Sequence, residues 1–180
     1  GLTHEDVSMA VLCQPVVQAR YAFVLHTVNP QTHNPDEIYG EVVCGMGEAL
    51  VGNFAGRAMS FVANKNDLTN PKVTGFPSKA NGLFTDSPTL IFRSDSNGED
   101  LEGFAGAGLY DSVTVAPTET KIVNYTENWL VWDADRRTAL MAKLAELAVA
   151  IEVEMKAPQD IEGCVVGDDI YVLQSRNQVL

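Results

Sequence analysis

The stretch DIEGCVVGDDIYVLQSR, residues 160–176, determines how the end of the chain folds. Two runs of strand-forming residues flank GDD, which has the residue types of a tight turn, so the stretch predicts a β-hairpin. Side chains two residues apart in a strand share a face. Asp160 and Glu162 are therefore expected on one face of the first arm, and Gln174 and Arg176 on one face of the second.

The register of this hairpin determines which of these side chains meet. If the turn is centred on residues 167–168, regular pairing places Glu162 opposite Leu173, one step away from Gln174. A one-residue bulge or a shifted turn would instead place Glu162 directly opposite Gln174. Carboxylate and amide oxygens suit Mg²⁺, and Arg176 would suit a phosphate. The alternative is a solvated edge hairpin with a cross-strand ion pair.

A long helix is predicted over residues 134–156. Apolar side chains recur there at helical spacing, at Leu140, Leu144, Leu147, Ile151 and Met155. Asp133 or Asp135 is expected to cap its start, and Pro158 to stop it.

The rest of the chain is expected to consist mainly of strands and loops. Strands are predicted at residues 9–14, 21–28, 38–44, 57–63, 90–92 and 108–115. The first is expected to be buried and to be interrupted by Pro15, whereas residues 64–88 are expected to form loops with at most one short strand. This order predicts an α+β fold with a mixed or antiparallel sheet, a long packing helix and a C-terminal β-hairpin.

The composition excludes some classes of protein. The chain has 180 residues, and 12 Lys and Arg against 24 Asp and Glu give a formal net charge of −12. Nucleic-acid binding depends on Lys and Arg that neutralise phosphates, so no nucleic acid is expected as a partner. No apolar run approaches the ~20 residues of a membrane span, and residues 1–10 do not resemble a signal peptide, so no membrane partner is expected either.

The three cysteines, Cys13, Cys44 and Cys164, lie in apolar strand-like contexts. They are expected to be buried thiols of a protein in a reducing compartment, and their spacing does not suggest zinc.

The three histidines have no spacing that suggests a catalytic triad. His26 lies in an apolar strand and is expected to be a satisfied core histidine, while His33 is expected in a loop and His4 has no assigned role.

Three further segments are candidates for ligand binding. In residues 93–108, RSDSNGEDLEGFAGAG, glycines allow the backbone to cradle a phosphate, but four acids oppose it unless they turn away or bind a metal. The alternative there is a polar surface loop.

Residues 45–52, GMGEALVG, are expected to form either a helix N-terminus that binds an anion or a plain strand–helix corner. In residues 12–17, LCQPVV, Pro15 interrupts the strand and can leave backbone groups for a planar ligand such as adenine.

Together, the segments MAVLCQPVV, EIYGEVVCGMGEALVG, LIFRSDSNGEDLEGFAGAGLYDSV and QDIEGCVVGDDIYVLQSR resemble the C-terminal nucleotide-binding region of the alpha-glucan, water dikinase family of plants and algae. That family is related to pyruvate, phosphate dikinase and phosphoenolpyruvate synthase, whose ATP-binding domain has the ATP-grasp fold. The resemblance covers nearly the whole chain. It implies that residues 1–180 form a partial ATP-grasp-like domain that binds ATP and Mg²⁺ within a larger enzyme.

The resemblance also implies roles for individual residues of the hairpin. Glu162 and Gln174 match the family's Mg²⁺ ligands, and Asp160 matches the acid that accompanies them. Arg176 matches an arginine that contacts the phosphates of ATP.

Other parts of the chain match further positions of the family's nucleotide site. The hinge that lines adenine is matched by Gln14, Pro15, Val16 and Val17. Arg93 matches a second phosphate-binding arginine, although in the related pyruvate and phosphoenolpyruvate enzymes that motif precedes the hinge. Glu48 lies in a segment similar to a GxGE loop of the family.

The activity implied by the resemblance is that of a phosphotransferase in the plastid stroma. The β-phosphate of ATP passes through a phosphohistidine to a glucosyl residue of starch, and the γ-phosphate passes to water. The lobe with a lysine and the phosphohistidine domain are expected elsewhere in the enzyme, so this chain alone is not expected to phosphorylate glucan. The alternatives are the nucleotide-binding domain of a pyruvate- or phosphoenolpyruvate-type dikinase, or a non-catalytic structural module.

Overall fold

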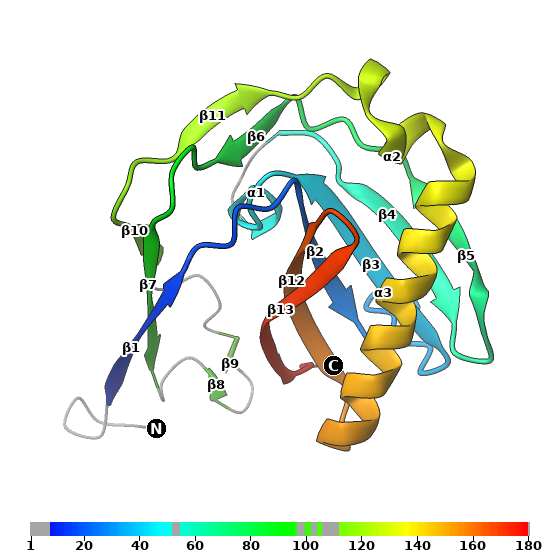
Figure 1. The fold of residues 1–180 in the computed structure, drawn as a ribbon. Helices are drawn as coiled ribbons and strands as arrows, with labels where there is room; N and C mark the ends of the chain where they lie inside the picture. Colours follow the sequence, from blue (N-terminus) through cyan, green and yellow to red (C-terminus); the bar gives the residue numbers. More distant parts are fainter. Residues whose placement is uncertain (1–7, 52–54, 97–99, 102–103, 106–111, 180) are drawn as a thin grey trace. The chain divides into compact units, whose positions relative to one another are not determined.

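The computed structural model describes residues 8–51, 55–96, 100–101, 104–105 and 112–179. The chain divides into two compact units (Figure 1). Unit 1 consists of Gly1–Gln18 and Thr85–Glu119, and unit 2 of Ala19–Phe84 and Thr120–Leu180. The fold is α+β, with antiparallel strand pairing and one long helix, which confirms the predicted fold class at that level.

Unit 2 is built on a six-stranded antiparallel sheet of order β13-β12-β2-β3-β4-β5. Its strands are β2 (Tyr21–His26), β3 (Glu37–Cys44), β4 (Met59–Asn64), β5 (Asp67–Gly75), β12 (Gln159–Val166) and β13 (Asp169–Asn177). Five of the six lie close to where the sequence predicts strands. Strand β5 has nine residues and falls in residues 64–88, where loops with at most one short strand were predicted. It contains Pro71, and an edge strand tolerates proline because one side of its backbone has no ladder partner.

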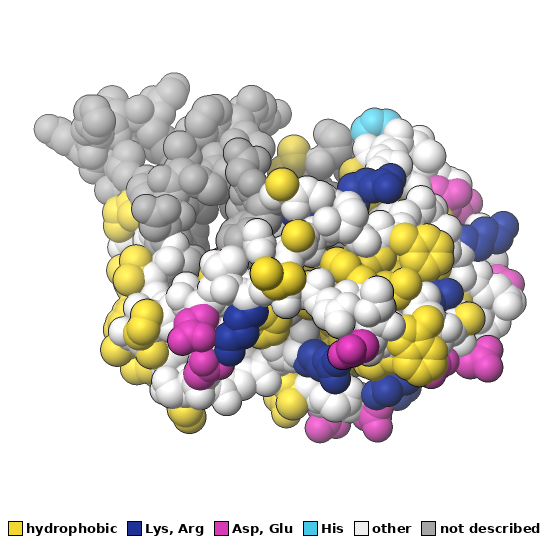
Figure 2. All heavy atoms as spheres, turned by 90° about the horizontal axis from the view of Figure 1, so that it is seen from above, with side chains coloured by type: hydrophobic (Ala, Val, Ile, Leu, Met, Phe, Trp, Pro, Cys, Tyr) yellow, Lys and Arg dark blue, Asp and Glu magenta, His cyan; other side chains and the backbone are white. Residues whose placement is uncertain are grey.

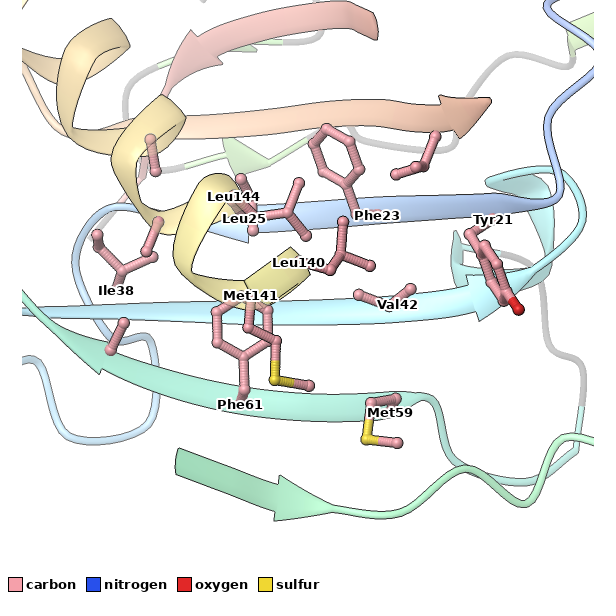
Figure 3. Close-up of a cluster of buried hydrophobic side chains, with 14 of the residues drawn as sticks. Tyr21, Phe23, Leu25, Ile38, Val42, Met59, Phe61, Leu140, Met141 and Leu144 are labelled. Carbon is pink, nitrogen blue, oxygen red and sulfur yellow. The ribbon is translucent and has the colours of Figure 1, made fainter. Parts of the chain in front are cut away.

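The long helix α3 (Ala134–Met155) covers one face of this sheet. Phe23, Leu25 and Phe61 of the sheet form a common core with helix residues Met141 and Leu144 (Figure 3). The prediction of the helix is confirmed within a residue at its C-terminal end.

The buried stripe of α3 differs from the predicted one. It consists of Leu140, Met141, Leu144, Ala145 and Ala148. Met155 is 51% exposed, so the predicted apolar stripe extends too far along the helix. Alanines complete the buried stripe because small side chains allow the helix to approach the sheet closely.

The start and end of α3 are fixed by local hydrogen bonds. The Asp133 carboxylate accepts a hydrogen bond from the backbone N–H of Arg136, which confirms Asp133 as the cap. At the other end, Lys156 adopts the left-handed conformation with φ 58°, and the chain turns there into β12.

Shorter elements complete unit 2. They are α1 (Glu48–Val51), β6 (Asn81–Phe84) paired with β11 (Glu119–Ile122, of which Glu119 is counted in unit 1), the 3₁₀ turn η2 (Tyr125–Glu127) and α2 (Trp129–Trp132). Of these, the sequence predicts only the strand–helix corner at α1. Asn128 caps α2 and also accepts a hydrogen bond from the buried Tyr21 hydroxyl, at 2.7 Å, which ties this connection to the sheet. Among the described residues, no helix is both long and apolar enough to span a membrane.

Unit 1 contains a three-stranded antiparallel sheet of β1 (Met9–Pro15), β7 (Leu90–Ser96) and β10 (Ser112–Thr114). A two-residue pair, β8 (Asp100–Leu101) and β9 (Phe104–Ala105), also belongs to this unit.

The prediction of a buried first strand is wrong. Val11 of β1 is 66% exposed and Cys13 is exposed, so Cys13 is not the buried thiol that was expected. Cys44 and Cys164 are buried, as expected, and burial raises the pKa of the Cys164 thiol to about 11. The β1 pattern failed because an apolar run predicts a strand well but does not indicate whether a layer covers it.

Figure 2 shows how the charged side chains are distributed on one face of the molecule. On the face drawn in Figure 2, the described Lys and Arg side chains lie among acidic ones, with hydrophobic side chains between them.

Candidate functional site

The hairpin of β12 and β13 contains a bulge at the position that determines its register. From the turn up to Gly163, pairing is regular, and Gly163 lies opposite Val172. The register then shifts by one residue, so that Glu162 lies opposite Gln174 and Leu173 is the inserted residue. The structure therefore realises the bulged alternative of the two registers left open by the sequence.

The bulge moves two side chains to the other face of the sheet. Without the inserted residue, Gln174 would share a face with Val172, because strand side chains alternate. With it, Gln174 and Arg176 share the face of Glu162 and Asp160, which lie opposite them.

This face is the one that points away from α3. Ile161, between Asp160 and Glu162, is fully buried in the core beneath the helix, so its two neighbours point to the opposite side. The hairpin therefore presents carboxylate, amide and guanidinium groups on a face that the long helix does not cover.

Asp160 and Arg176 form an ion pair across the two strands. The Arg176 Nε and one terminal nitrogen both donate to the same carboxylate oxygen, Oδ2, at 3.0 and 2.8 Å. The Asp160 side chain is 14% exposed and the Arg176 side chain is 36% exposed, so solvent screens this ion pair in part. The cross-strand ion pair of the edge-hairpin alternative thus exists, within the same polar face as Glu162 and Gln174.

The polar face continues on the next two strands. Asp160 lies opposite His26 of β2, whose Nδ1 is 3.7 Å from Oδ1 of the carboxylate. His26 in turn lies opposite Tyr39 of β3, and the Tyr39 hydroxyl donates to Glu41 at 2.9 Å. Burial, followed by the hydrogen bond to Glu41 and its charge, raises the pKa of Tyr39 to about 12.

His26 departs from the expectation of a satisfied core histidine. Its side chain is 25% exposed, and its Nδ1 is buried without a hydrogen-bond partner among the described residues. Sequence reasoning also did not identify Tyr39 and Glu41. The alternation of β3 contained the signal, since Tyr39 and Glu41 are two residues apart between the core residues Ile38 and Val42.

The donor set on this face fits a hard cation. Glu162 and Gln174 are paired partners, both are half-buried, and their side-chain oxygens are of the type that Mg²⁺ prefers. The described part of the chain contains no cluster of three or more His, Cys, Asp or Glu that could hold a metal ion. Mg²⁺ commonly takes only one or two carboxylates together with water and phosphate oxygens, so two protein ligands suffice for such a site.

Unit 1 holds the other predicted nucleotide-binding residues except Glu48. Gln14 and Pro15 end β1, and Arg93 lies in β7 opposite Leu12. Since paired residues share a face, Gln14 and Arg93 lie on the same face of the unit 1 sheet.

The hinge segment follows β1 directly. The Val16 amide donates to the Thr89 carbonyl at 2.8 Å, so this amide is already engaged, and Val16 and Val17 are half-buried. Much of residues 93–108 lies outside the described residues, as do residue 4 and half of the predicted strand 108–115.

Glu48 is in unit 2, in the first turn of α1. That helix has only four residues and follows Gly45, whose φ of 86° makes the sharp turn out of β3. The structure therefore contains the strand–helix corner that the sequence predicted.

Comparison with known proteins adds a second line of support. The family model described as "Pyruvate phosphate dikinase, AMP/ATP-binding domain" matches residues 1–74. The chain is 50% identical over 178 residues to the chloroplastic alpha-glucan water dikinase of Solanum tuberosum, and 51% identical over 178 residues to alpha-glucan water dikinase 2 of Arabidopsis thaliana. These alignments cover 99% of this chain but only 12% and 14% of the two relatives.

A more distant relative broadens the comparison. The chain is 28% identical over 193 residues to the phosphoenolpyruvate synthase of Aeropyrum pernix, which covers all of this chain and 22% of that enzyme. The matches confirm the resemblance on which the sequence-based expectation of a phosphotransferase family rested.

Proposed function

We propose that the chain, which is similar in sequence to alpha-glucan water dikinases and to a phosphoenolpyruvate synthase, forms the Mg-ATP-binding part of a glucan dikinase. Residues 1–180 are then a partial, ATP-grasp-like ATP-binding domain within a longer enzyme. The observation that carries the proposal is the bulged hairpin, because it places Glu162 opposite Gln174 and Asp160 opposite Arg176 on one face.

Each of these side chains has a role that follows from its chemistry. Glu162 and Gln174 hold the Mg²⁺ that accompanies ATP, and the ion neutralises phosphate charge when it is bound. Arg176 contacts the phosphates, and Asp160 fixes the orientation of the guanidinium through two hydrogen bonds. Positioning and charge neutralisation are the main demands of phosphoryl transfer, so such a hairpin serves the reaction directly.

The other matched residues are assigned by their resemblance to the family. In unit 1, Gln14, Pro15, Val16 and Val17 are assigned to adenine and Arg93, in β7, to phosphate. In unit 2, Glu48 at the start of α1 is assigned to nucleotide binding.

The names of the relatives indicate a dikinase of alpha-glucan and water, and we propose this reaction for the whole enzyme, with the course that the family resemblance implies. The β-phosphate of ATP reaches a glucosyl residue of starch through a phosphohistidine in another domain, and the γ-phosphate passes to water. Three of the relatives are named as chloroplastic, so we place the enzyme in the plastid stroma. The isolated chain is expected to leave glucan unphosphorylated, and glucan-bound phosphate formed by the purified chain would contradict this part of the proposal.

Calorimetric titration of the chain with ATP, with and without Mg²⁺, tests the proposed site. Binding is expected to require Mg²⁺ and to weaken by more than about tenfold in the double variant Glu162→Ala/Gln174→Ala, because each lost contact to a charged group contributes about 1.5–3 kcal/mol. Asp169→Asn, which removes one charge at the exposed turn end of the hairpin, is the matched control and is expected to bind as the unmodified chain does.

Two results would contradict the proposal. Equal binding by the double variant would remove the metal site from this hairpin. Absence of Mg-ATP binding by the folded chain would favour the non-catalytic structural module.

A further inference from the structure

Arg176 of β13, Asp160 of β12 and His26 of β2 form a row across the sheet, and one oxygen of the Asp160 carboxylate in this row has no hydrogen-bond donor among the described residues. Arg176 donates two hydrogen bonds to Oδ2 of Asp160, and Oδ1 is the second oxygen of this carboxylate. Oδ1 is buried and has no hydrogen-bond partner among the described residues. A buried carboxylate oxygen without a donor is unfavourable, so the group that faces it is informative.

That group is His26. Its Nδ1 is also buried, also has no hydrogen-bond partner among the described residues, and lies 3.7 Å from Oδ1. This distance is too long for a hydrogen bond, but a shift of less than about 1 Å brings the two atoms to hydrogen-bonding distance. A hydrogen bond from Nδ1–H of His26 to Oδ1 of Asp160 would therefore satisfy both buried atoms.

The surroundings of His26 favour this pairing. On β12 it faces Asp160, with Glu162 two residues further on the same face. On β3 it faces Tyr39, whose ring lies 6.3 Å away, centre to centre, at an angle of 30°. Glu41, on the same face of β3, already accepts the Tyr39 hydroxyl hydrogen.

We propose that His26 is a positioning residue that donates its Nδ1–H to Oδ1 of Asp160 and thereby holds the carboxylate in the orientation that binds Arg176. The order of the row is then His26, Asp160, Arg176, with the donors on both sides of one carboxylate. His26 carries its proton on Nδ1. The contribution of Arg176 to phosphate binding rests on the proposed function above, whereas the row itself does not.

Nuclear magnetic resonance on the 180-residue chain tests the row without any nucleotide. The ring ¹⁵N signals of His26 are expected to show the Nδ1–H tautomer in the neutral ring, and a ring that carries its proton on Nε2 would overturn the proposal. This measurement requires no substitution, so it does not depend on the folding of a variant.

Exchange of the Arg176 Nε–H with water then measures the positioning effect. His26→Leu keeps apolar volume but removes the donor, and is expected to speed this exchange about twofold to tenfold, the change that corresponds to one hydrogen bond of ~0.5–1.5 kcal/mol. His26→Asn can place an amide N–H where Nδ1 lies and is expected to restore slow exchange. The Arg137 Nε–H on α3, away from the row, is the internal reference and is expected to stay unchanged.

Equal exchange of Arg176 in the unmodified chain and in His26→Leu would overturn the proposal, as would His26→Asn behaving like His26→Leu. These outcomes are separate from those of the proposed function. If the folded chain failed to bind Mg-ATP, the tautomer and the exchange rates would still decide whether His26 positions Asp160.

Discussion

Gly163 is the residue on which the bulged register of the hairpin depends, and Gly163→Ala is the sharpest test of it. A Cβ atom built at this position would lie 2.4 Å from the Tyr171 carbonyl oxygen of β13 and 2.2 Å from Cζ of the buried Phe23 ring. Contacts below 3.0 Å are essentially never seen for a real Cβ, and ordinary contacts begin near 3.4 Å. Strand β13 would therefore have to retreat by about 1 Å at its bulge.

The expected cost follows from this geometry. Overpacking a well-filled core costs about 1–3 kcal/mol, and here one of the two contacts is a backbone atom that no rotamer change relieves. We expect Gly163→Ala to lower the free energy of unfolding by about 2–4 kcal/mol, which corresponds to a melting temperature lower by roughly 5–15 °C in a chain of this size.

Denaturant unfolding followed by tryptophan fluorescence is a suitable assay, because both tryptophans, Trp129 and Trp132, belong to unit 2. The matched control is Gly47→Ala. A Cβ there meets only the Ala22 side chain, at 3.8 Å, and the backbone needs no positive φ. This control is expected to change stability by less than about 1 kcal/mol, and to raise it if it changes at all, since alanine restricts the unfolded chain.

Two results would refute the reasoning about Gly163. One is a stability of Gly163→Ala within about 0.5 kcal/mol of the unmodified chain, which is the usual range for substitutions without a structural consequence. The other is full recovery of the lost stability in Gly163→Ala/Phe23→Leu, because the ring and not the approach of β13 would then be the cause.

Two further predictions concern other parts of unit 2. The free energy of unfolding is expected to fall between pH 10 and about 12 in the unmodified chain and to fall less in Tyr39→Phe. The folded state raises the pKa of Tyr39 and so favours the neutral hydroxyl, which means that this stabilisation is complete below the unfolded pKa of 10.0 and is lost as the pH rises to about 12. The loss is at most ~1.4 kcal/mol per pH unit. Unfolding measured across this range checks it, and an unchanged pH dependence would contradict it. Asp133→Ala is expected to cost about 0.5–2 kcal/mol of stability through loss of the cap on the Arg136 amide. Asp135→Ala, two residues further on and exposed, is expected to cost less, and equal costs in denaturant unfolding would contradict the cap.

The sequence predicted those elements whose signals are local. The helix was predicted within a residue at its end because the cap at Asp133 and the apolar spacing act within the segment itself. The two arms of the hairpin were predicted because Gly167, with φ 61°, suits a tight turn between strand-forming runs. The exposure of β1 was not predictable in this way, since it depends on which layers cover the strand and not on its own residues.

The candidate site could be predicted only in part, for a related reason. Alternation correctly grouped Asp160 with Glu162 and Gln174 with Arg176, but it could not show that the two groups face each other. That relation depends on the inserted residue Leu173, and a bulge has no strong signature in the strand that contains it.

The signal for the bulge lies on the partner strand. Gly163 is the residue that allows the β13 backbone to approach within 2.4 Å of the position that a Cβ would occupy. A glycine in the middle of a strand usually weakens it, so its presence between Glu162 and Cys164 requires an explanation. The explanation is that the bulge places all four polar side chains on one face of the hairpin, at the cost of one regular pair in the ladder. Regular pairing would have turned Gln174 and Arg176 toward the core beneath α3. The glycine is thus part of the candidate site, although its own atoms make no contact with a ligand.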